Sequence, residues 1–290
     1  MAEIPDFKTL FRLDGKVAVI TGGSTGIGYY IAASFMQAGA SQVIVTSRKE
    51  QGLSEAVNKL NAIPDVPGRA SYLVSNISTM EGVEKLTTDL QRVLPDGKLH
   101  ILVNNAAASW GGSFEEYDDW KVAKTFDVNV RAVFNLTRKL QPYLMKAASK
   151  EDPARIIIVS SVGGIVVPHV GQTGAIAYSA SKAAAHHLGR NFAMELVPHN
   201  ITTNIIAPGW FPTRLANPAI EKAGGEEVAG SSNPMGRLGV PEDIAGVAVY
   251  LCSRAGRYIN GEDISVDGGS RLLNASAANH IAKVRRSSRL

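Results

Sequence analysis

Hydrophobic residues along the chain gather in short, β-branched runs that alternate with longer stretches of helical periodicity. The expected strands are KVAVI (16–20), QVIVTS (42–47), ASYLVS (70–75), HILVN (100–104), RIIIVSS (155–161), ITTNIIA (201–207) and DISV (263–266). Amphipathic or alanine-rich stretches at 26–39, 49–61, 79–94, 120–147, 178–197 and 241–252 are the expected helices. This alternation builds right-handed βαβ units, so it predicts an α/β fold with one doubly wound parallel sheet of about seven strands and helices on both faces.

The same pattern predicts one folded domain over residues 1–272, because neither an internal repeat nor a linker interrupts it. Segment 213–240, rich in glycine, proline and small polar residues, is expected to be a surface loop or a mobile lid over a substrate pocket. Its place after the sixth strand favours the lid. Residues 273–290 are expected to form a flexible basic tail.

The formal charge of +4 equals the four cations of the last eight residues, Lys283, Arg285, Arg286 and Arg289, so the folded body is near neutral. A nucleic-acid surface is therefore not expected. The single cysteine, Cys252, excludes an intramolecular disulfide and a cysteine-based zinc site. The six histidines lack metal-ligand spacing, and we expect structural or surface roles for them. No apolar run approaches the ~18 residues of a membrane span.

A glycine-rich turn, Thr21-Gly-Gly-Ser-Thr-Gly-Ile-Gly28, follows the first strand and leads into a helix. Glycines in such a turn let the backbone approach a pyrophosphate, which then faces the helix N-terminal N–H groups. This position in a βαβ pattern favours a dinucleotide site and a Rossmann-type sheet over a plain loop. The expected cofactor contacts in the turn are Gly22, Ser24, Thr25, Gly26, Ile27 and Gly28.

The end of the second strand indicates which dinucleotide is bound. An NAD site usually carries a carboxylate there, whereas this chain has Ser47 and Arg48. Arg48 offers a planar, bidentate donor for a 2′-phosphate and Ser47 offers a further donor, so NADP(H) is favoured over NAD(H). The alternative interpretation is that Arg48 and Lys49 only begin a solvated helix.

Two tyrosines stand four residues ahead of a lysine, Tyr178 in YSASK and Tyr117 in YDDWK. Ketone reduction needs an acid near the substrate oxygen, and a lysine one helical turn away would bring the pKa of that tyrosine closer to neutrality. The spacing alone does not decide which of the two tyrosines has this role.

The motifs TGGSTGIG, NNAA (104–107), Asn129 in DVNV, Ser161 in VSSVGG, YSASK and PGWFPT (208–213) together resemble those of the short-chain dehydrogenase/reductase family, in its order and approximate spacing. The resemblance covers about residues 14–270. It selects Tyr178 as the acid/base, because the family carries no catalyst at the position of Tyr117. Tyr117 and Lys121 are then interpreted as an ordinary pair on a helix surface.

The resemblance also implies the roles of the neighbouring side chains. Lys182 would hold the nicotinamide ribose, Ser161 would hydrogen-bond to the substrate oxygen, and Asn129 would support a water relay for the proton. Ser160 is the competing serine, but neighbouring strand residues face opposite ways and the family's serine matches Ser161.

Further cofactor contacts are implied at the ends of later strands. By resemblance these are Asn76, Asn105, Ala106, Tyr178, Lys182, Pro208, Gly209, Phe211 and Thr213. Two residues depart from the family pattern, Asn76 for aspartate and Ala107 for glycine; the latter is restrictive if a positive φ is required. The interval of 17 residues from Ser161 to Tyr178 exceeds the usual spacing of about a dozen, which predicts an enlarged loop at the mouth of the substrate pocket.

Within the family, NNAAASWGG, PARIIIVSSVGGI and NPMGRLGVPEDIA resemble β-ketoacyl reductases of the rhamnolipid type and their fungal relatives. This implies reduction of a 3-oxoacyl thioester, such as an acyl-CoA, to its 3-hydroxy form. Trp110, Val167, Trp210 and Phe211 are expected to flank the pocket, which would equally receive an aromatic polyketide or a terpenoid. The alternatives are a ketoreductase of fungal secondary metabolism, a 2,4-dienoyl-CoA reductase and an NADP-binding sensor without turnover.

The terminal tripeptide Ser288-Arg289-Leu290 is a conservative variant of the Ser-Lys-Leu peroxisomal address. It predicts recognition by the import receptor and a peroxisomal location, with a cytoplasmic enzyme as the alternative. Family resemblance further implies a homo-oligomer, a tetramer or a dimer, formed through helices such as 120–147 and 178–197. These helices would otherwise be buried within one subunit.

Overall fold

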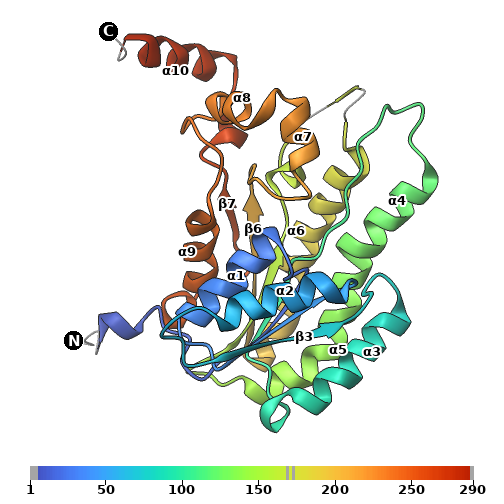
Figure 1. Ribbon diagram of the computed structural model, residues 1–290, viewed down its shortest axis with the longest axis vertical. Helices are drawn as coiled ribbons and strands as arrows, with labels where there is room; N and C mark the ends of the chain where they lie inside the picture. The colour runs from blue at the N-terminus through green and yellow to red at the C-terminus, as the bar shows by residue number, and fades with distance from the viewer. Residues whose placement is uncertain (1–5, 168–169, 172–173, 288–290) are drawn as a thin grey trace.

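The computed structural model describes residues 6–167, 170–171 and 174–287, and Figure 1 shows their arrangement. In this part of the chain seven strands form one sheet, in the order β3-β2-β1-β4-β5-β6-β7, and all neighbours run parallel. The strands are β1 (Val17–Thr21), β2 (Gln42–Ser47), β3 (Arg69–Val74), β4 (Ile101–Asn104), β5 (Ala154–Val159), β6 (Ile201–Pro208) and β7 (Asp263–Val266). The predicted doubly wound parallel sheet is confirmed.

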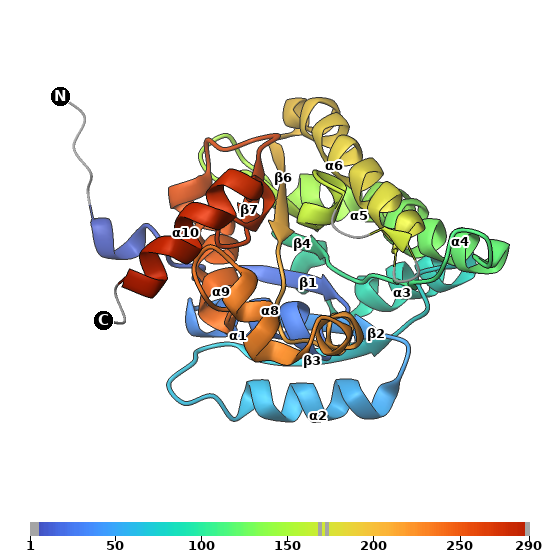
Figure 2. The same ribbon diagram turned by 90° about the horizontal axis from the view of Figure 1, so that it is seen from above.

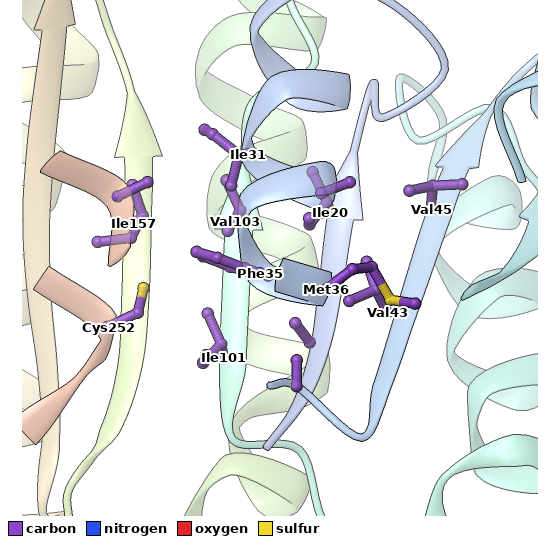
Figure 3. Close-up of a cluster of buried hydrophobic side chains, with 14 of the residues drawn as sticks. Ile20, Ile31, Phe35, Met36, Val43, Val45, Ile101, Val103, Ile157 and Cys252 are labelled. Carbon is purple, nitrogen blue, oxygen red and sulfur yellow. The ribbon is translucent and has the colours of Figure 1, made fainter. Parts of the chain in front are cut away.

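Side chains of the strands alternate between two hydrophobic cores, one on each face of the sheet. In β1, Ala18 and Ile20 lie in the first core, whereas Val17 and Val19 lie in the second. Figure 3 shows the first core, where Phe35 and Met36 of a covering helix pack against strand residues. Because both faces are covered, the central strands β1, β4 and β5 are apolar at most positions, which gives the continuous apolar runs in the sequence.

Helices cover both faces of the sheet (Figure 2). The first core is closed by α1 (Gly26–Gln37), α2 (Glu50–Asn61) and α9 (Pro241–Cys252), and the second by α3 (Met80–Val93), α5 (Ala132–Ala147) and α6 (Ile176–Leu196). The stretch 120–147, predicted as one helix, is divided into α4 (Asp119–Phe126), a π-helical turn (Asp127–Arg131) and α5. Among the described residues, no helix has the length and apolar character needed to cross a membrane.

Segment 213–240, expected to be a loop or lid, contains two short helices, α7 (Asn217–Lys222) and α8 (Gly225–Ser232). They enclose a small core of their own, made of Ile220, Ala229 and Leu238, with Trp210 packed against it. Figure 1 shows both helices above the ends of the strands. The segment is therefore an ordered cap beside the sheet rather than an irregular loop.

Residues 275–287 form a helix, α10 (Ala275–Ser287), although the sequence led us to expect a flexible tail from residue 273. The Arg285 guanidinium donates to the carbonyl oxygens of Ser231, Asn233 and Pro234 at 2.9, 3.0 and 2.7 Å. These carbonyls lie at and just after the end of α8, where cationic donors satisfy the free carbonyls of a helix. The expectation of a flexible tail is thus wrong for this stretch, while Ser288-Arg289-Leu290 lies outside the described residues.

Candidate active site

The candidate residues lie after the carboxyl ends of six neighbouring strands, which meet at one edge of the sheet. The glycine turn follows β1, Arg48 follows β2, Asn76 follows β3, Asn105 follows β4, Ser161 follows β5 and the PGWFPT segment follows β6. The strand order reverses between β1 and β4, so the crevice of a doubly wound sheet opens beside the glycine turn. The topology therefore brings together residues that are far apart in the sequence.

The glycine turn packs directly against the segment that follows β4. A Cβ on Gly28 would lie 2.4 Å from Asn105 Nδ2 and 2.5 Å from the Gly22 carbonyl oxygen. Gly22 and Gly26 have φ of +67° and +57°, a region that favours glycine. Thr25 precedes α1 in an extended conformation without a side-chain capping bond, so the first N–H groups of the helix keep the capacity to bind an anion.

Asn105 joins the turn to the neighbouring strand. Its side-chain amide donates to the Thr21 carbonyl oxygen at 2.9 Å, and its backbone N–H donates to the Thr21 hydroxyl at 3.0 Å. The Ala106 N–H donates to the same hydroxyl at 3.0 Å. Asn105 thus has a role in holding the shape of the glycine turn, which the family resemblance did not assign to it.

The segment after β6 reaches across to the same turn. Gly209 donates its N–H to Val266 at 2.9 Å, and Thr213 lies so close to Gly26 that a Cβ there would be 3.0 Å from the Thr213 methyl group. Phe211 is only 2 % exposed, and its ring packs against Gly239 within the first core. The Phe211 ring therefore packs into the first core, and Phe211 also lines, with Trp210, a hollow of about 340 Å³ near this segment, so its place beside the substrate pocket stays a prediction.

Three further residues, Ser47, Arg48 and Asn76, were predicted to contact the adenosine half of the cofactor. Arg48 follows β2 with an exposed side chain, and Ser47 gives its carbonyl oxygen to the N–H of Ser75 at 2.9 Å. Asn76 is exposed, and its side-chain oxygen accepts from the Ser78 hydroxyl at 2.8 Å. Among the described residues, Ala107 is absent from the positive-φ positions, so alanine is not restrictive there.

The two serines at the end of β5 have different partners. The Ser160 hydroxyl is buried and donates to the Lys182 carbonyl oxygen at 3.0 Å, which fixes α6 against the strand. The Ser161 hydroxyl accepts from the Gly163 N–H at 3.1 Å and makes a hydrogen bond with Tyr178. Ser161 is the serine that faces the tyrosine, and Ser160 has a structural role.

Tyr178 and Lys182 lie one turn apart at the start of α6. Burial raises the pKa of Tyr178, and the hydrogen bond from Ser161 opposes this rise. The Lys182 ammonium donates to the Val159 carbonyl oxygen at 2.8 Å and lies 5.6 Å from the centre of the Tyr178 ring. Desolvation of the phenol is the largest influence, so the net shift of the Tyr178 pKa is upward, whereas the sequence predicted a downward one.

Burial also lowers the pKa of Lys182 to about 8, so its ammonium keeps a charge at neutral pH. The raised pKa of Tyr178 keeps its phenol protonated at the same pH. The pair therefore presents a neutral acid and a nearby cation, the combination that protonation of a developing alkoxide requires.

Asn129 is buried in the π-helical turn between α4 and α5. Its side chain exchanges two hydrogen bonds with the backbone of Ala108, at 2.8 and 2.9 Å, and donates to the Ser181 hydroxyl at 2.9 Å. Ser181 in turn donates to the Tyr178 carbonyl oxygen at 2.7 Å. Asn129 thus connects the segment after β4 to the catalytic helix, and Ser181, which the sequence analysis did not single out, is the intermediate residue within YSASK.

Tyr117 and Lys121 do not form the predicted helix-surface pair. Tyr117 precedes α4, and its hydroxyl donates to the Trp110 carbonyl oxygen at 2.7 Å. The Lys121 ammonium pairs with Asp118 at 2.7 Å. The prediction that this tyrosine is not the catalytic acid agrees with its position in the loop before α4.

The enlarged loop between Ser161 and Tyr178 is described in part, because Pro168, His169, Gln172 and Thr173 lie outside the described residues. Val167 and Val170 are strongly exposed. A hollow of about 340 Å³ near the cap is lined by Trp210, Leu238 and Asp267, among others. A second hollow, of about 400 Å³, is lined by residues that include Ser78, Thr79 and Arg131. The candidate catalytic residues Ser161, Tyr178 and Lys182 line neither of these two hollows. Among the described side chains, no group of three His, Cys, Asp or Glu residues is arranged to hold a metal ion.

Comparison with known proteins agrees with this geometry. The family model described as Enoyl-(Acyl carrier protein) reductase matches residues 22–271, which include the glycines of the turn, Asn129, Ser161, YSASK and PGWFPT. The chain belongs to the short-chain dehydrogenase/reductase family. The chain described here is 38 % identical over 262 residues to the rhamnolipids biosynthesis 3-oxoacyl-[acyl-carrier-protein] reductase of Pseudomonas aeruginosa. The match covers 90 % of this chain and 98 % of that protein.

A second relative is a tropinone reductase homolog of Arabidopsis thaliana, 35 % identical over 268 residues, with 92 % of this chain and 97 % of the relative covered. Among solved structures, the Pseudomonas aeruginosa RhlG/NADP active-site complex matches with a TM-score of 0.83 at 38 % identity, covering 91 % of this chain and 99 % of that one. The fold of that NADP complex is thus similar to the fold found here over nearly the whole chain.

The residues present fit a dinucleotide on structural grounds. A Cβ at Gly26 or Gly28 would be crowded by Thr213 or Asn105. Glycine at these positions lets the backbone of the turn lie close to the place where the pyrophosphate would bind. Ser161, Tyr178 and Lys182 lie at the same strand edge, from which they can reach a carbonyl placed beside the nicotinamide. The arrangement can bind a ketone oxygen, donate a proton to it and stabilise the charge that develops on it.

Proposed function

We propose that this protein is an NADP(H)-dependent ketoreductase that interconverts a ketone and a secondary alcohol, with a 3-oxoacyl thioester as substrate. The observation that carries the proposal is the hydrogen-bonded Ser161–Tyr178 pair, with the buried Lys182 one turn later on α6. Bound NADPH supplies the hydride. All other steps belong to the side chains of the protein.

In the reduction, the Ser161 hydroxyl donates to the substrate oxygen and Tyr178 transfers its phenolic proton to that oxygen. Tyr178 becomes a phenolate, which the Lys182 ammonium stabilises until solvent returns the proton. Asn129 holds the segment after β4 against the start of α6, so the tyrosine keeps its orientation while the charge changes. The reverse reaction uses the same groups with the proton moving the other way.

The thioester assignment is supported by the relative that acts on a 3-oxoacyl group, which matches over nearly the whole chain. The tropinone reductase homolog supports a second candidate, a ketone of secondary metabolism, because the same fold serves different ketones. Retention of Ser161, Tyr178 and Lys182 argues against a sensor without turnover.

The test is oxidation of NADPH and NADH by the purified full chain, with acetoacetyl-CoA and a longer 3-oxoacyl-CoA as substrates. We expect turnover with NADPH that increases with acyl length. Binding of NADPH without turnover of either thioester would contradict the acyl assignment, and ketones of secondary metabolism would be tested next. Turnover of a 2,4-dienoyl-CoA in preference to both ketones would exclude ketone reduction as the main activity.

Arg48 provides the test of cofactor choice. Its exposed guanidinium follows β2, next to the glycine turn, where it can bind a 2′-phosphate through two charge-assisted hydrogen bonds. We expect Arg48→Gln to raise the KM for NADPH by about ten- to hundred-fold and to leave that for NADH within about two-fold. An equal KM for NADPH in both proteins would support the alternative that Arg48 only begins a solvated helix.

Two further proposals concern the setting of the enzyme. The terminal Ser-Arg-Leu supports import into peroxisomes, where acyl-CoA substrates occur. A tagged full chain that remains cytosolic in cells with intact import would contradict it.

Self-association is supported by exposed apolar side chains on α5 and α6, including Phe134 and Met194, and sedimentation of the purified protein would test it.

A further inference from the structure

His186 is a buried histidine on α6, one helical turn beyond Lys182 and only 3 % exposed. Its Nε2 lies 3.1 Å from the carbonyl oxygen of Ser161, and its Nδ1 lies 3.1 Å from Oδ1 of Asp263 on β7. The sequence analysis gave this residue only a structural or surface role. The structure places it against the backbone of the serine that faces Tyr178.

The chemistry of the two contacts fixes how the ring is used. A carbonyl oxygen only accepts hydrogen bonds, so Nε2 must carry the hydrogen and donate it to Ser161. Nδ1 makes a close contact with Asp263 Oδ1 that does not have the alignment of a hydrogen bond. Asp263 is paired on its other oxygen with Arg190. The ring thus connects Ser161 to a charged pair between α6 and β7.

The backbone around Ser161 is tightly enclosed on the same side. A Cβ on Gly164 would lie 2.8 Å from Cδ2 of His186 and 2.6 Å from the Lys182 carbonyl carbon. The Ser161 carbonyl oxygen also accepts from the Gly164 N–H at 3.0 Å, and the Ser161 hydroxyl accepts from Gly163 at 3.1 Å. The direction of that hydroxyl therefore depends on the short 3₁₀ turn Val162–Gly164. His186 packs against this turn beside Gly164 and contacts the Ser161 carbonyl oxygen that precedes it.

We propose that His186 is a positioning residue for the reduction, acting through Ser161, an inference that rests on the proposed function of that serine. By donating to the Ser161 carbonyl, His186 fixes the backbone that directs the serine hydroxyl toward Tyr178 and the substrate oxygen. Asp263 keeps the ring in place from the opposite edge. Small displacements of such groups reduce catalysis strongly, because the hydrogen bond must meet the oxygen where charge develops.

Two amide substitutions distinguish the contact of Nε2 with Ser161 from the contact of Nδ1 with Asp263. In His186→Gln the amide nitrogen can reach the place of Nε2 and donate to Ser161, whereas in His186→Asn it reaches only the place of Nδ1 and faces Asp263. We expect His186→Asn to lower kcat by about ten- to hundred-fold with the KM for NADPH within about two-fold, and His186→Gln to stay within about three-fold. His187→Asn, at the exposed neighbour on the same helix, is the matched control and should leave both constants unchanged.

Amide hydrogen exchange over residues 160–166 gives a readout that needs no substrate. Exchange should be faster in His186→Asn than in His186→Gln or the wild type, because the turn after Ser161 loses its support. If His186→Asn does not fold, Asp263→Ala serves instead: it keeps the Ser161 contact but removes the side chain that touches the other ring edge, and we expect faster exchange with about a three-fold loss of kcat.

The outcomes distinguish this proposal from the proposed function. Equal kcat values and equal exchange in the Asn and Gln variants would overturn the positioning role, whatever their melting temperatures. If the wild type reduces no ketone, the proposed function fails, and the exchange comparison still decides whether His186 holds the turn. A loss of thermal stability in both variants, with unchanged kcat, would show a structural role only.

Discussion

Replacing Tyr178 by phenylalanine is expected to lower kcat for ketone reduction by about a thousand-fold while NADPH affinity stays within about two-fold. The structure places the Tyr178 phenol beside Ser161, and a phenyl ring keeps the packing of α6 without a proton to donate. Because burial raises the pKa of Tyr178, the phenol is protonated at neutral pH, so its loss affects the reduction directly. Steady-state rates and NADPH fluorescence titration measure the two quantities separately.

The chain supplies its own control for this substitution. Tyr117 also precedes a lysine by four residues, but its hydroxyl donates to the Trp110 carbonyl oxygen in the loop before α4. Tyr117→Phe should cost about 1 kcal/mol of stability through that hydrogen bond and leave kcat within about three-fold. Equal losses of kcat in the two variants would show that Tyr178 has no special role, and full activity of Tyr178→Phe would exclude it as the acid.

The agreement between sequence and structure is closest where local pattern and topology coincide. The strands β1, β2, β5 and β6 are rich in β-branched residues, because both faces of the sheet are covered, and each of them leads into a candidate site segment at its carboxyl end. The glycine turn could therefore be located from its place in the βαβ pattern, whereas Ser161, Tyr178 and Lys182 were selected by the family resemblance. Strand alternation separated Ser160 from Ser161, the family resemblance selected Ser161, and their different partners agree with that choice.

The differences arise where the conformation depends on partners distant in sequence. The π-helical turn at Asn129 is held by Ala108 and Ser181, which no local periodicity encodes. The helix α10 is fixed by Arg285 on carbonyls more than fifty residues earlier, so a polar sequence suggested a tail. Phe211 lies in an irregular segment where neither helical nor strand alternation predicts the side-chain direction, and the structure directs its ring into the core.

Burial is the physical quantity that the sequence analysis underestimated at the site. From spacing alone, Lys182 was expected to lower the pKa of Tyr178, yet desolvation raises it and lowers that of Lys182 to about 8. Desolvation depends on how closely α6 packs against β5, which is a tertiary property. His186 was missed for the same reason, since its role depends on Ser161 and Asp263 rather than on the residues beside it in the chain.

Gly28→Ala is expected to raise the dissociation constant for NADPH by about ten- to hundred-fold and to destabilise the fold by about 1–3 kcal/mol. The backbone of Gly28 is helical, so strain in φ is not the cause. The added methyl group would lie 2.4 Å from Asn105 Nδ2 and 2.5 Å from the Gly22 carbonyl oxygen, and neither atom is the end of a long, flexible side chain. Relief of this overlap must displace the glycine turn itself, where the pyrophosphate would bind.

Gly246→Ala is the matched control, because Gly246 lies in α9 and nothing lies within 4 Å of the Cβ it would gain. A helix interior favours alanine over glycine, so this variant should be more stable by about 0.5–1 kcal/mol with unchanged NADPH binding. Isothermal titration and thermal unfolding of both proteins give the comparison. Tight NADPH binding by Gly28→Ala would mean that the turn can move away from Asn105 without loss, and the cofactor site would then not depend on the close contact between β1 and β4 that the structure shows.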